Sequence, residues 1–372
     1  MRPPTIRDVA DRAGVSKSLV SLVLRGSGQV RAEKREAVLR AVRELGYRPN
    51  TAARTLGETR ALGEAGASGE AGPLPSLRRR SGGGGGGRTR APLVGVVLHD
   101  LRNPWYVDLV DGLNSLLHAS GLHMLLADAR LNRRVGQDPA GSFLDLGADG
   151  LVVVGTLPDP AALDAVAERI PVVVAGAREP VPPGVDVVAG DDEQGARLAT
   201  EHLLALGHRR IAHIAGYGAV GELRRRSFEA VMRAHGARGA VVEPSDMTEE
   251  GGHRAAVRLL ARADRPTAVF AVNDIACVGA LSAAEELGLS VPRDLSVVGY
   301  DNTSTSRLRH LWLTTVDNAG HEVGRRAARC LLDRIEGRGG AGRVQLAAPL
   351  LEIRGTTATA PAAGPADRAL TD

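Results

Sequence analysis

The sequence predicts an all-α helix-turn-helix domain at the N-terminus, followed by a larger α/β core of two lobes with doubly wound parallel sheets. Apolar residues near the N-terminus recur at helical spacing in three short segments. From Leu93 onward, short apolar runs alternate with helical patterns that end in glycine, and a glycine-rich stretch separates the two regions. A chain of 372 residues is long enough for two or three domains with their own cores.

The first two helices are expected between residues 5 and 25. Apolar residues at positions 6, 9, 10 and 13 give the first helix one apolar face. Thr5 can cap this helix, Gly14 tolerates the left-handed backbone of a tight exit, and Ser16 supplies an oxygen to open the second helix. Apolar positions 20, 23 and 24 then point inward. The outward face of the second helix therefore consists of Lys17, Ser18, Ser21, Leu22 and Arg25.

This outward face suits DNA, because a helix-turn-helix inserts its second helix into the major groove. Lys17, Ser18 and Leu22 are the candidate base readers, and Leu22 can contact a thymine methyl. The candidates for phosphate contacts are residues with hydrogen-bond donors: Thr5, Ser16, Ser21 and Arg25. The alternative for this segment taken alone is a plain helical hairpin in some other fold.

The charge distribution favours the DNA-binding interpretation. Residues 1–60 carry 13 Lys and Arg against 6 Asp and Glu, although the whole chain has a net charge of only +4. A basic head on an acidic body is typical of a polyanion-binding module attached to a module with another role. The two cysteines show no CxxC spacing, and no apolar segment approaches the length of a membrane span. We therefore expect a cytoplasmic protein without a membrane partner.

A third helix and a shorter one are expected before the glycine-rich stretch. Val30 to Leu45 repeats the apolar helical spacing and ends at Gly46. Pro49 then breaks the chain, and a short helix of small residues follows. Two copies meeting on DNA could order this helix in the minor groove, with Leu56 wedged into a base step; the alternative is a frayed linker. The residues of this candidate hinge are Asn50, Ala53, Arg54 and Leu56.

Residues 58–92 are a low-complexity linker with an Arg-Arg-Arg cluster and six consecutive glycines. The glycines match GxGxxG trivially, but no strand precedes them and no helical pattern follows, so a nucleotide-binding loop is not expected. The 36 flexible residues from Gly57 to Pro92 would span roughly 30 to 36 Å. The sequence leaves open whether this linker weakens the mechanical coupling between the N-terminal domain and the core.

The core is predicted from seven apolar runs and the helices between them. The clearest strands are LVGVVLH, HMLLA, GLVVVG, PVVVAG, IAHIAG, TAVFAV and LSVVGY. The clearest helices run from Gln194 to Leu206, from Leu223 to His235 and from Ala276 to Leu287, each before a glycine. About 280 residues are too many for one ordinary sheet, so two lobes with a cleft are expected.

The motifs DVADRAGVS, VSLVLRG and LGYRPNTAAR, in this order and spacing, resemble the lactose-repressor (LacI/GalR) family of bacterial transcription regulators. The resemblance implies a homodimer on a pseudo-palindromic operator, with a recognition helix in each major groove and paired hinge helices in the central minor groove. The sequence departs from the family at Leu19, Leu22 and Arg25, where many members carry Thr, Arg and Asn. The operator sequence therefore cannot be transferred from a relative.

The resemblance continues in the core through DLRNPWYVDLVDGL, GDDEQGARLATEHLLALGHRRIAHIAG, FAVNDIACVGAL, VPRDLSVVGYDN, LTTVDN and LEIRGTT. It implies a periplasmic-binding-protein-like pair of lobes, joined by crossing segments near Gly190, near Val316 and in the 340s. In this family a small effector, most often a sugar, binds in the cleft and changes operator affinity.

The candidate effector-binding residues lie at strand ends or match ligand-contacting positions of the family: Asn103, Trp105, Tyr106, Arg178, Arg224, Asn273 and Asp301. A sugar needs hydrogen-bonding side chains and an aromatic platform, and open α/β sheets bind ligands at the carboxyl ends of strands. The alternative for Trp105 and Tyr106 is a role in the core or an interface. The alternative for Asn273 and Asp301 is strand-end capping.

Catalysis is not expected, because the chain lacks HExxH, GxSxG and P-loop motifs. The acidic cluster Asp191, Asp192 and Glu193 directly precedes a helix, where the helix dipole favours carboxylates. No metal site or cofactor is predicted. The domains are expected at 1–49 (helix-turn-helix), 50–57 (hinge helix), 58–92 (linker), 93–360 (core) and 361–372 (disordered tail). The expected function is an effector-controlled regulator, and the resemblance implies a repressor. The alternative is a sugar-binding protein without operator-specific regulation.

Overall fold

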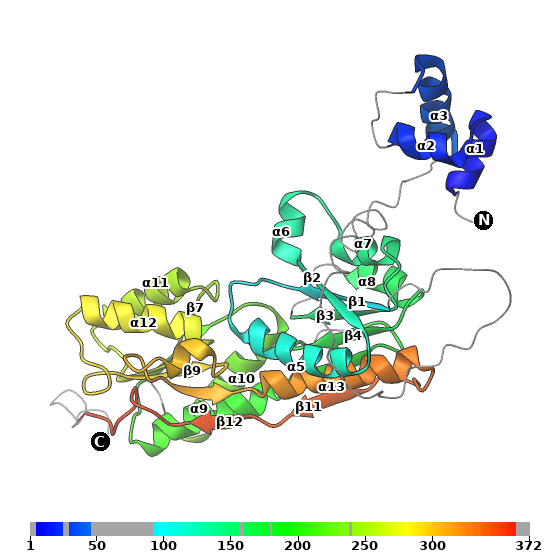
Figure 1. Ribbon diagram of the computed structural model, residues 1–372. Coiled ribbons are helices and arrows are strands. Elements are labelled where there is room, and N and C mark those ends of the chain that lie inside the picture. The colour runs from blue at the N-terminus through cyan, green and yellow to red at the C-terminus, as the bar shows by residue number, and fades with distance from the viewer. Residues whose placement is uncertain are drawn as a thin grey trace, which may run out of the picture. The chain divides into compact units, whose positions relative to one another are not determined.

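The computed structural model describes residues 5–24, 30–45, 92–155, 160–178, 181–237 and 240–361. The chain divides into two compact units, residues 1–74 and 75–372, and each is described here by itself (Figure 1). The candidate hinge residues and the linker lie outside the described residues, as do Arg25 and the tail after residue 361.

The N-terminal unit consists of α1 (Ile6–Ala13), α2 (Lys17–Leu24) and α3 (Ala32–Leu45). Thr5 and Asp8 form a capping box at the start of α1, and Gly14 ends it in the left-handed conformation with φ 63°. The inward residues meet in one small core made of Val9, Ala10, Val20, Val23, Val38 and Ala41. The predicted helix-turn-helix with a third helix is confirmed, although α3 begins at Ala32 rather than at residue 30.

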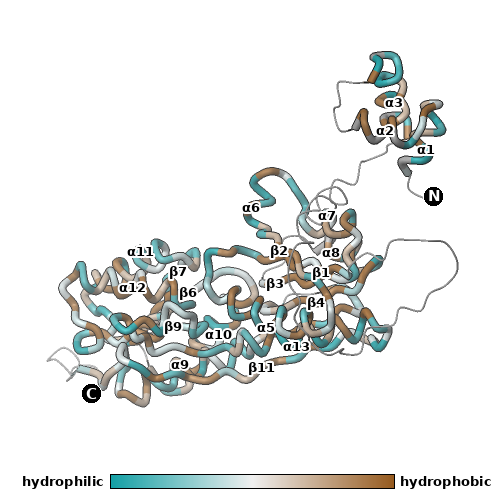
Figure 2. The backbone as a smooth tube through the Cα atoms, viewed as in Figure 1, coloured by the Kyte–Doolittle hydropathy of each residue, from teal (hydrophilic) through white to brown (hydrophobic). Residues whose placement is uncertain are grey.

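The larger unit contains two six-stranded sheets with the orders β11-β5-β4-β3-β1-β2 and β12-β10-β9-β8-β6-β7. All pairs are parallel except β10 with β12. The seven predicted strands are β1 (Leu93–Leu98), β2 (His123–Asp128), β3 (Gly150–Val154), β4 (Val172–Ala175), β6 (Ile211–Ala215), β8 (Ala268–Ala271) and β9 (Ser296–Tyr300). Figure 2 shows the hydrophobic stretches of this unit along these strands.

Five further strands were not predicted from the apolar runs: β5 (Asp186–Gly190), β7 (Val241–Pro244), β10 (Thr314–Asp317), β11 (Val344–Ala347) and β12 (Leu350–Glu352). Three of them, β7, β11 and β12, are sheet edges and only partly buried, so they need no continuous apolar run. The other two are mostly buried, but polar residues interrupt their short sequences.

Helices cover both faces of each sheet, which confirms the doubly wound arrangement. In the first lobe, α5 (Trp105–Ala119) and α13 (Gly320–Ile335) cover one face, and α7 (Pro139–Asp145) and α8 (Pro160–Ala167) the other. In the second lobe, α11 (Glu249–Leu260) and α12 (Asp274–Glu286) pack opposite α9 (Asp192–Ala205) and α10 (Gly218–Ala234). The short α6 (Ala129–Arg134) follows β2, and a 3₁₀ turn spans Ser304–Arg307.

The three predicted helices of the second lobe begin earlier than expected. They start two to five residues before the predicted positions because their first turns are polar or glycine-rich and carry little apolar signal. Two of these starts are capped by side chains, since the backbone N–H groups of Gln194 and Ala276 donate to Asp191 and Asn273.

The chain crosses between the lobes three times, from β5 into α9, from β10 into α13 and from β11 into β12. These crossings match the segments expected near Gly190, near Val316 and in the 340s. In the described part of the chain, no helix is both long and apolar enough to span a membrane.

Candidate functional site

A cavity with a volume of about 280 Å³ lies between the two lobes. The first lobe contributes residues that follow the carboxyl ends of β1, β3 and β4, as open α/β sheets do at ligand sites. The second lobe contributes side chains from the starts of α9, α10, α11 and α12 and from the turn after β9. Of the seven predicted effector residues, six line this cavity: Asn103, Trp105, Tyr106, Arg224, Asn273 and Asp301.

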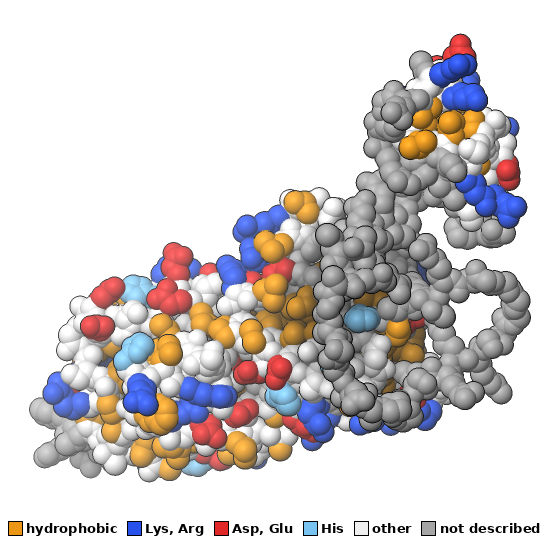
Figure 3. All heavy atoms as spheres, viewed as in Figure 1, with side chains coloured by type: hydrophobic (Ala, Val, Ile, Leu, Met, Phe, Trp, Pro, Cys, Tyr) orange, Lys and Arg blue, Asp and Glu red, His pale blue; other side chains and the backbone are white. Residues whose placement is uncertain are grey.

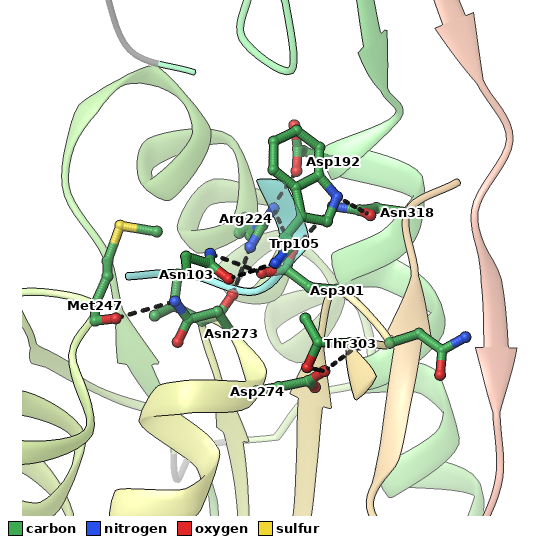
Figure 4. A network of polar contacts seen from close by, with 12 residues as sticks. Asn103, Trp105, Asp192, Arg224, Met247, Asn273, Asp274, Asp301, Thr303 and Asn318 are labelled. Atoms are coloured by element: carbon green, nitrogen blue, oxygen red, sulfur yellow. Dashed lines mark hydrogen bonds and ion pairs between the residues drawn. The ribbon is translucent and has the colours of Figure 1, made fainter. Parts of the chain in front are cut away.

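Arg224 is buried on α10 and held on several sides (Figure 4). Its Nε donates to Asp192 Oδ1 at 2.9 Å, its Nη1 donates to the carbonyl of Val272, and its guanidinium lies 3.6 Å from the centre of the Tyr300 ring. Its Nη2 lies 3.7 Å from Asp301 Oδ1. Burial opposes the charge, but the two carboxylates outweigh it and raise the pKa of Arg224 above its usual value. The guanidinium is therefore fixed, charged and directed at the cavity.

Asp301 follows β9 in a left-handed conformation with φ 104°. Its carboxylate accepts hydrogen bonds from Asn103 Nδ2 at 3.3 Å and from Asn318 Nδ2 at 2.9 Å, so it joins the two lobes and a crossing segment. Burial raises the pKa of Asp301 to about 7, although Arg224 acts in the opposite direction. Asp301 therefore forms a turn, which is the alternative role expected from the sequence, and it also lines the cavity.

Trp105 and Tyr106 are both buried, and they line the cavity as well as the core of the first lobe. The Trp105 Nε1 donates to Asn318 Oδ1 at 2.7 Å, and a Cβ at Gly176 would lie only 2.3 Å from the indole ring. Burial raises the pKa of the Tyr106 hydroxyl. Trp105 and Tyr106 therefore belong both to the core of the first lobe and to the wall of the cavity.

Asn103 and Asn273 also have local structural roles. Asn273 accepts from the backbone N–H of Ala276 at 2.8 Å, which caps α12, and donates to the carbonyl of Met247 at 3.1 Å. Asn103 accepts from the backbone N–H of Trp105 at 3.0 Å. The capping alternative for Asn273 is thus realised, and it holds the amide at the cavity wall.

Arg178 is the exception, because it does not line the cavity. Its Nη2 lies 3.6 Å from Glu193 Oε2, at the first turn of α9. Arg178 is drawn to Glu193 by its opposite charge. The ion pair joins the two lobes beside the cavity rather than within it.

The sequence reasoning missed several lining residues, among them Asp192, Tyr217, Asp246, Met247 and Asn318. The acidic cluster at the start of α9 was attributed to the helix dipole, but only Asp191 caps the helix; Asp192 is buried against Arg224. Asn318 lies in the motif LTTVDN, whose polar end was the available signal. Residues 217 and 245–248 lie in loops without a periodic pattern, so nothing in the sequence marked them.

In the N-terminal unit, Lys17 and Leu22 are exposed on α2, as predicted. Ser16 Oγ accepts from the backbone N–H of Leu19 at 3.3 Å, and the Thr5 hydroxyl donates to Asp8 at 2.7 Å. The side chains of Ser18 and Ser21 lie outside the described part. Among the described residues, no group of three or more His, Cys, Asp or Glu side chains is arranged to hold a metal ion.

Comparison with known proteins gives two family matches. Residues 5–50 match the bacterial regulatory proteins of the lacI family, and residues 200–357 match a periplasmic binding protein-like domain. The chain is 32% identical to the HTH-type transcriptional repressor PurR of Erwinia tasmaniensis over 89% of this chain and 90% of the relative. It is 34% identical to the HTH-type transcriptional regulator CelR of Thermobifida fusca over 90% of this chain and 93% of the relative.

Two solved structures resemble nearly the whole chain. A CelR–cellobiose complex is 29% identical with a TM-score of 0.65, covering 95% of this chain and 99% of the other. The lac repressor dimer bound to operator and the anti-inducer ONPF is 27% identical with a TM-score of 0.61, covering 96% and 100%. The matching helix-turn-helix, the two-lobed core and these relatives together establish that this chain belongs to the LacI family of bacterial transcriptional regulators.

Proposed function

We propose that this regulator represses transcription by occupying a pseudo-palindromic operator as a homodimer, and that a sugar in the cavity between the lobes controls its operator affinity. The observation that carries the effector part is the convergence of Arg224, Asp301, Asn103 and Trp105 from both lobes on one cavity. A ligand that contacts both lobes stabilises one arrangement of them, which is the requirement for allosteric control.

The chemistry of the cavity suits a sugar. Vicinal hydroxyls need paired acceptors and donors, which the Asp301 carboxylate, the Arg224 guanidinium and the Asn103 and Asn273 amides supply. The indole of Trp105 offers apolar surface for a sugar ring. The CelR–cellobiose complex supports this assignment, because that relative binds a sugar on the same fold.

The operator part rests on the exposed face of α2. We assign base reading to Lys17, Ser18 and Leu22, and phosphate contacts to Thr5, Ser16, Ser21 and Arg25. Residues 50–57 are assigned to the minor groove through Asn50, Ala53, Arg54 and Leu56. The domain boundaries stated above belong to the same proposal. The operator-bound lac repressor supports it as a relative that binds DNA.

The homodimer needs a surface, and the first lobe offers one. The edge strand β2 exposes both Leu125 and Leu126, and the neighbouring α6 segment exposes Leu131 and Val135. Figure 3 shows hydrophobic side chains over α6 and beside it. An exposed apolar patch beside an open sheet edge favours a second copy as its partner. The two-fold symmetry expected of the operator also requires two copies.

One experiment tests the whole proposal. The purified protein is selected against a library of DNA duplexes at fixed salt, and selection is repeated with a panel of neutral mono- and disaccharides. We expect enrichment of a palindrome whose affinity one sugar changes. Enrichment without any sugar effect would refute sugar control, and sugar binding without enrichment would favour a binding protein that does not regulate an operator.

A further inference from the structure

The floor of the cavity, formed by Asp192, Arg224 and Asp301, holds two carboxylates and one guanidinium. The side chains in both ion pairs of this floor are only 5% exposed, so solvent screens their charges weakly. Asp192 lies closer to Arg224, at 2.9 Å, and neutralises its charge. Asp301 is the additional carboxylate, 3.7 Å from Arg224. Burial raises the pKa of Asp301 to about 7, so all three groups are ionised, and the cavity floor has a formal charge of −1, at pH 8 and above.

The hydrogen-bond donors of the cavity floor are largely used within the protein. Nε and Nη1 of Arg224 already donate to Asp192 and to the carbonyl of Val272, which leaves Nη2 for a ligand. The nearby amides of Asn103 and Asn318 donate to Asp301. Carboxylate oxygens accept several hydrogen bonds each, so the cavity floor offers a ligand more acceptors than donors.

The rest of the lining does not supply a free cation. Among the described residues that line the cavity, Arg102 is the other Lys or Arg side chain, and it pairs with Asp100. Asp246 and Glu249 also line the cavity, and of these two carboxylates Asp246 pairs with Arg254 at 3.3 Å. Figure 4 shows the guanidinium of Arg224 near Asp192 and Asp301. Among the described lining residues, an incoming anion therefore meets no Lys or Arg side chain that lacks a carboxylate partner.

We infer that the cavity selects uncharged sugars, whose hydroxyls donate to Asp301 and Asp192, and rejects sugar phosphates and sugar acids. This inference rests on the proposed function and narrows its effector class. A phosphate or carboxylate group near neutral pH offers few or no donors, and it would be desolvated beside a net negative charge in a site of low dielectric. Hydroxyl groups match the excess of acceptors without that cost.

The test compares matched ligands that differ by one anionic group: glucose and glucose 6-phosphate, ribose and ribose 5-phosphate, and glucose and glucuronate. Binding to the full-length protein is measured by calorimetry at pH 8, where the Asp301 carboxyl is mostly ionised, and at fixed ionic strength. We expect at least one neutral member to bind and its anionic partner to bind at least about tenfold more weakly. Equal or tighter binding of the anionic partner would overturn the charge selection but leave sugar control intact.

Variants separate charge from shape. Asp192→Asn keeps the size of the side chain but leaves the charge of Arg224 less compensated, so the ratio of neutral to anionic affinity should fall about tenfold. Asp264→Asn removes the same charge from an exposed carboxylate beside Arg262, outside the cavity, and should leave the ratio unchanged. An equal ratio in Asp192→Asn and the native protein would overturn the role of the cavity floor. If no sugar of either kind binds or changes operator affinity, the proposed function fails, and this inference fails with it.

Discussion

Single side chains in the cavity serve two purposes at once. Asn318 is buried in the crossing segment between β10 and α13, where its amide accepts from Trp105 of the first lobe and donates to Asp301 of the second. Asp301 likewise forms part of a strained turn and of the cavity floor. The cavity wall and the lobe geometry are therefore linked through the same few atoms.

Replacing Asn318 with Ala should weaken effector binding about tenfold. The change removes two buried hydrogen bonds, each worth roughly 0.5–1.5 kcal/mol, and leaves Trp105 Nε1 without a partner. Calorimetry with the sugar that the proposed panel selects measures the effect. Asn114→Ala, an exposed change on the α5 helix that begins at Trp105, is the control. An unchanged affinity in Asn318→Ala would show that this bridge does not position the cavity.

The carboxyl of Asp301 makes stability depend on pH. Burial raises its pKa to about 7 in the folded chain, whereas an unfolded Asp titrates near 4. The folded state binds the proton more tightly, so this contribution to stability is complete below about pH 4 and is lost as pH rises through 7. The buried carboxyl of Asp274, with a pKa raised to about 6 by burial, acts in the same direction.

Asp301→Asn should therefore lose less stability than the native protein between pH 5 and pH 7.5. Urea denaturation at both pH values, without effector, measures the difference. Asp264→Asn removes an exposed carboxyl whose pKa is lowered mainly by a hydrogen bond from Arg262. The free energy of unfolding of this variant should fall as much as that of the native protein. A native-like fall in Asp301→Asn would show that Asp301 does not titrate in this range.

At the scale of elements, close packing of α5 and α13 positions the cavity wall of the first lobe. The two helices lie side by side (Figure 1) and meet at glycines, because a Cβ at Gly112 would lie 2.0 Å from the carbonyl oxygen of His321. A Cβ at Gly324 would lie 2.1 Å from the carbonyl oxygen of Leu109. The same two helices begin next to Trp105 and Asn318, so their separation sets the geometry of both.

Gly324→Ala should destabilise the core by about 1–3 kcal/mol, because the helix backbones must separate to admit a methyl group. It should also weaken effector binding, since α5 begins at Trp105. Thermal unfolding and calorimetry measure the two effects. Gly340→Ala is the matched control, because nothing lies within 4 Å of its added Cβ. Equal stability of the two variants would contradict the close packing.

The exposed face of α2 carries a prediction of its own. Lys17→Ala should change which half-site sequence is preferred, because a base-reading side chain discriminates by roughly 1–3 kcal/mol per base pair. Selection from a duplex library measures the preference. Arg7→Ala, at an exposed position of α1, removes the same charge and should lower affinity without changing the preferred sequence. An unchanged preference in Lys17→Ala would remove Lys17 from the base readers.

At the scale of the whole molecule, the distance along the chain between the two units matters for control. Residues 58–92 separate the proposed hinge helix from the first strand of the core, and their composition is rich in glycine and arginine. A long low-complexity linker transmits less mechanical strain than a short one. Along the chain, the cavity and the N-terminal unit are connected through these residues.

Deleting residues 61–88 should increase the change in operator affinity that the effector causes, towards the roughly 5- to 150-fold range usual for allosteric coupling. Operator titrations with and without the effector measure this ratio. Replacing the same residues with an equal length of Gly and Ser keeps the length and should leave the ratio unchanged. An unaltered ratio after the deletion would show that linker length does not limit control.

The sequence alone determined the features that local chemistry specifies. The capping residue Thr5, the left-handed Gly14 and the apolar spacing of α1 to α3 predicted the N-terminal unit, and the continuous apolar runs predicted the buried strands. Resemblance to the family supplied Arg224 and Asp301, which periodicity could not have distinguished from ordinary polar residues.

Tertiary structure alone decided what meets across the fold. Asp192 pairs with Arg224, Asn318 bridges Trp105 and Asp301, and Arg178 turns to Glu193 instead of the cavity. The edge strands likewise depend on their neighbours rather than on an apolar run of their own. These contacts join residues far apart in the chain, and their energies depend on burial and distance, which no local pattern of the sequence encodes.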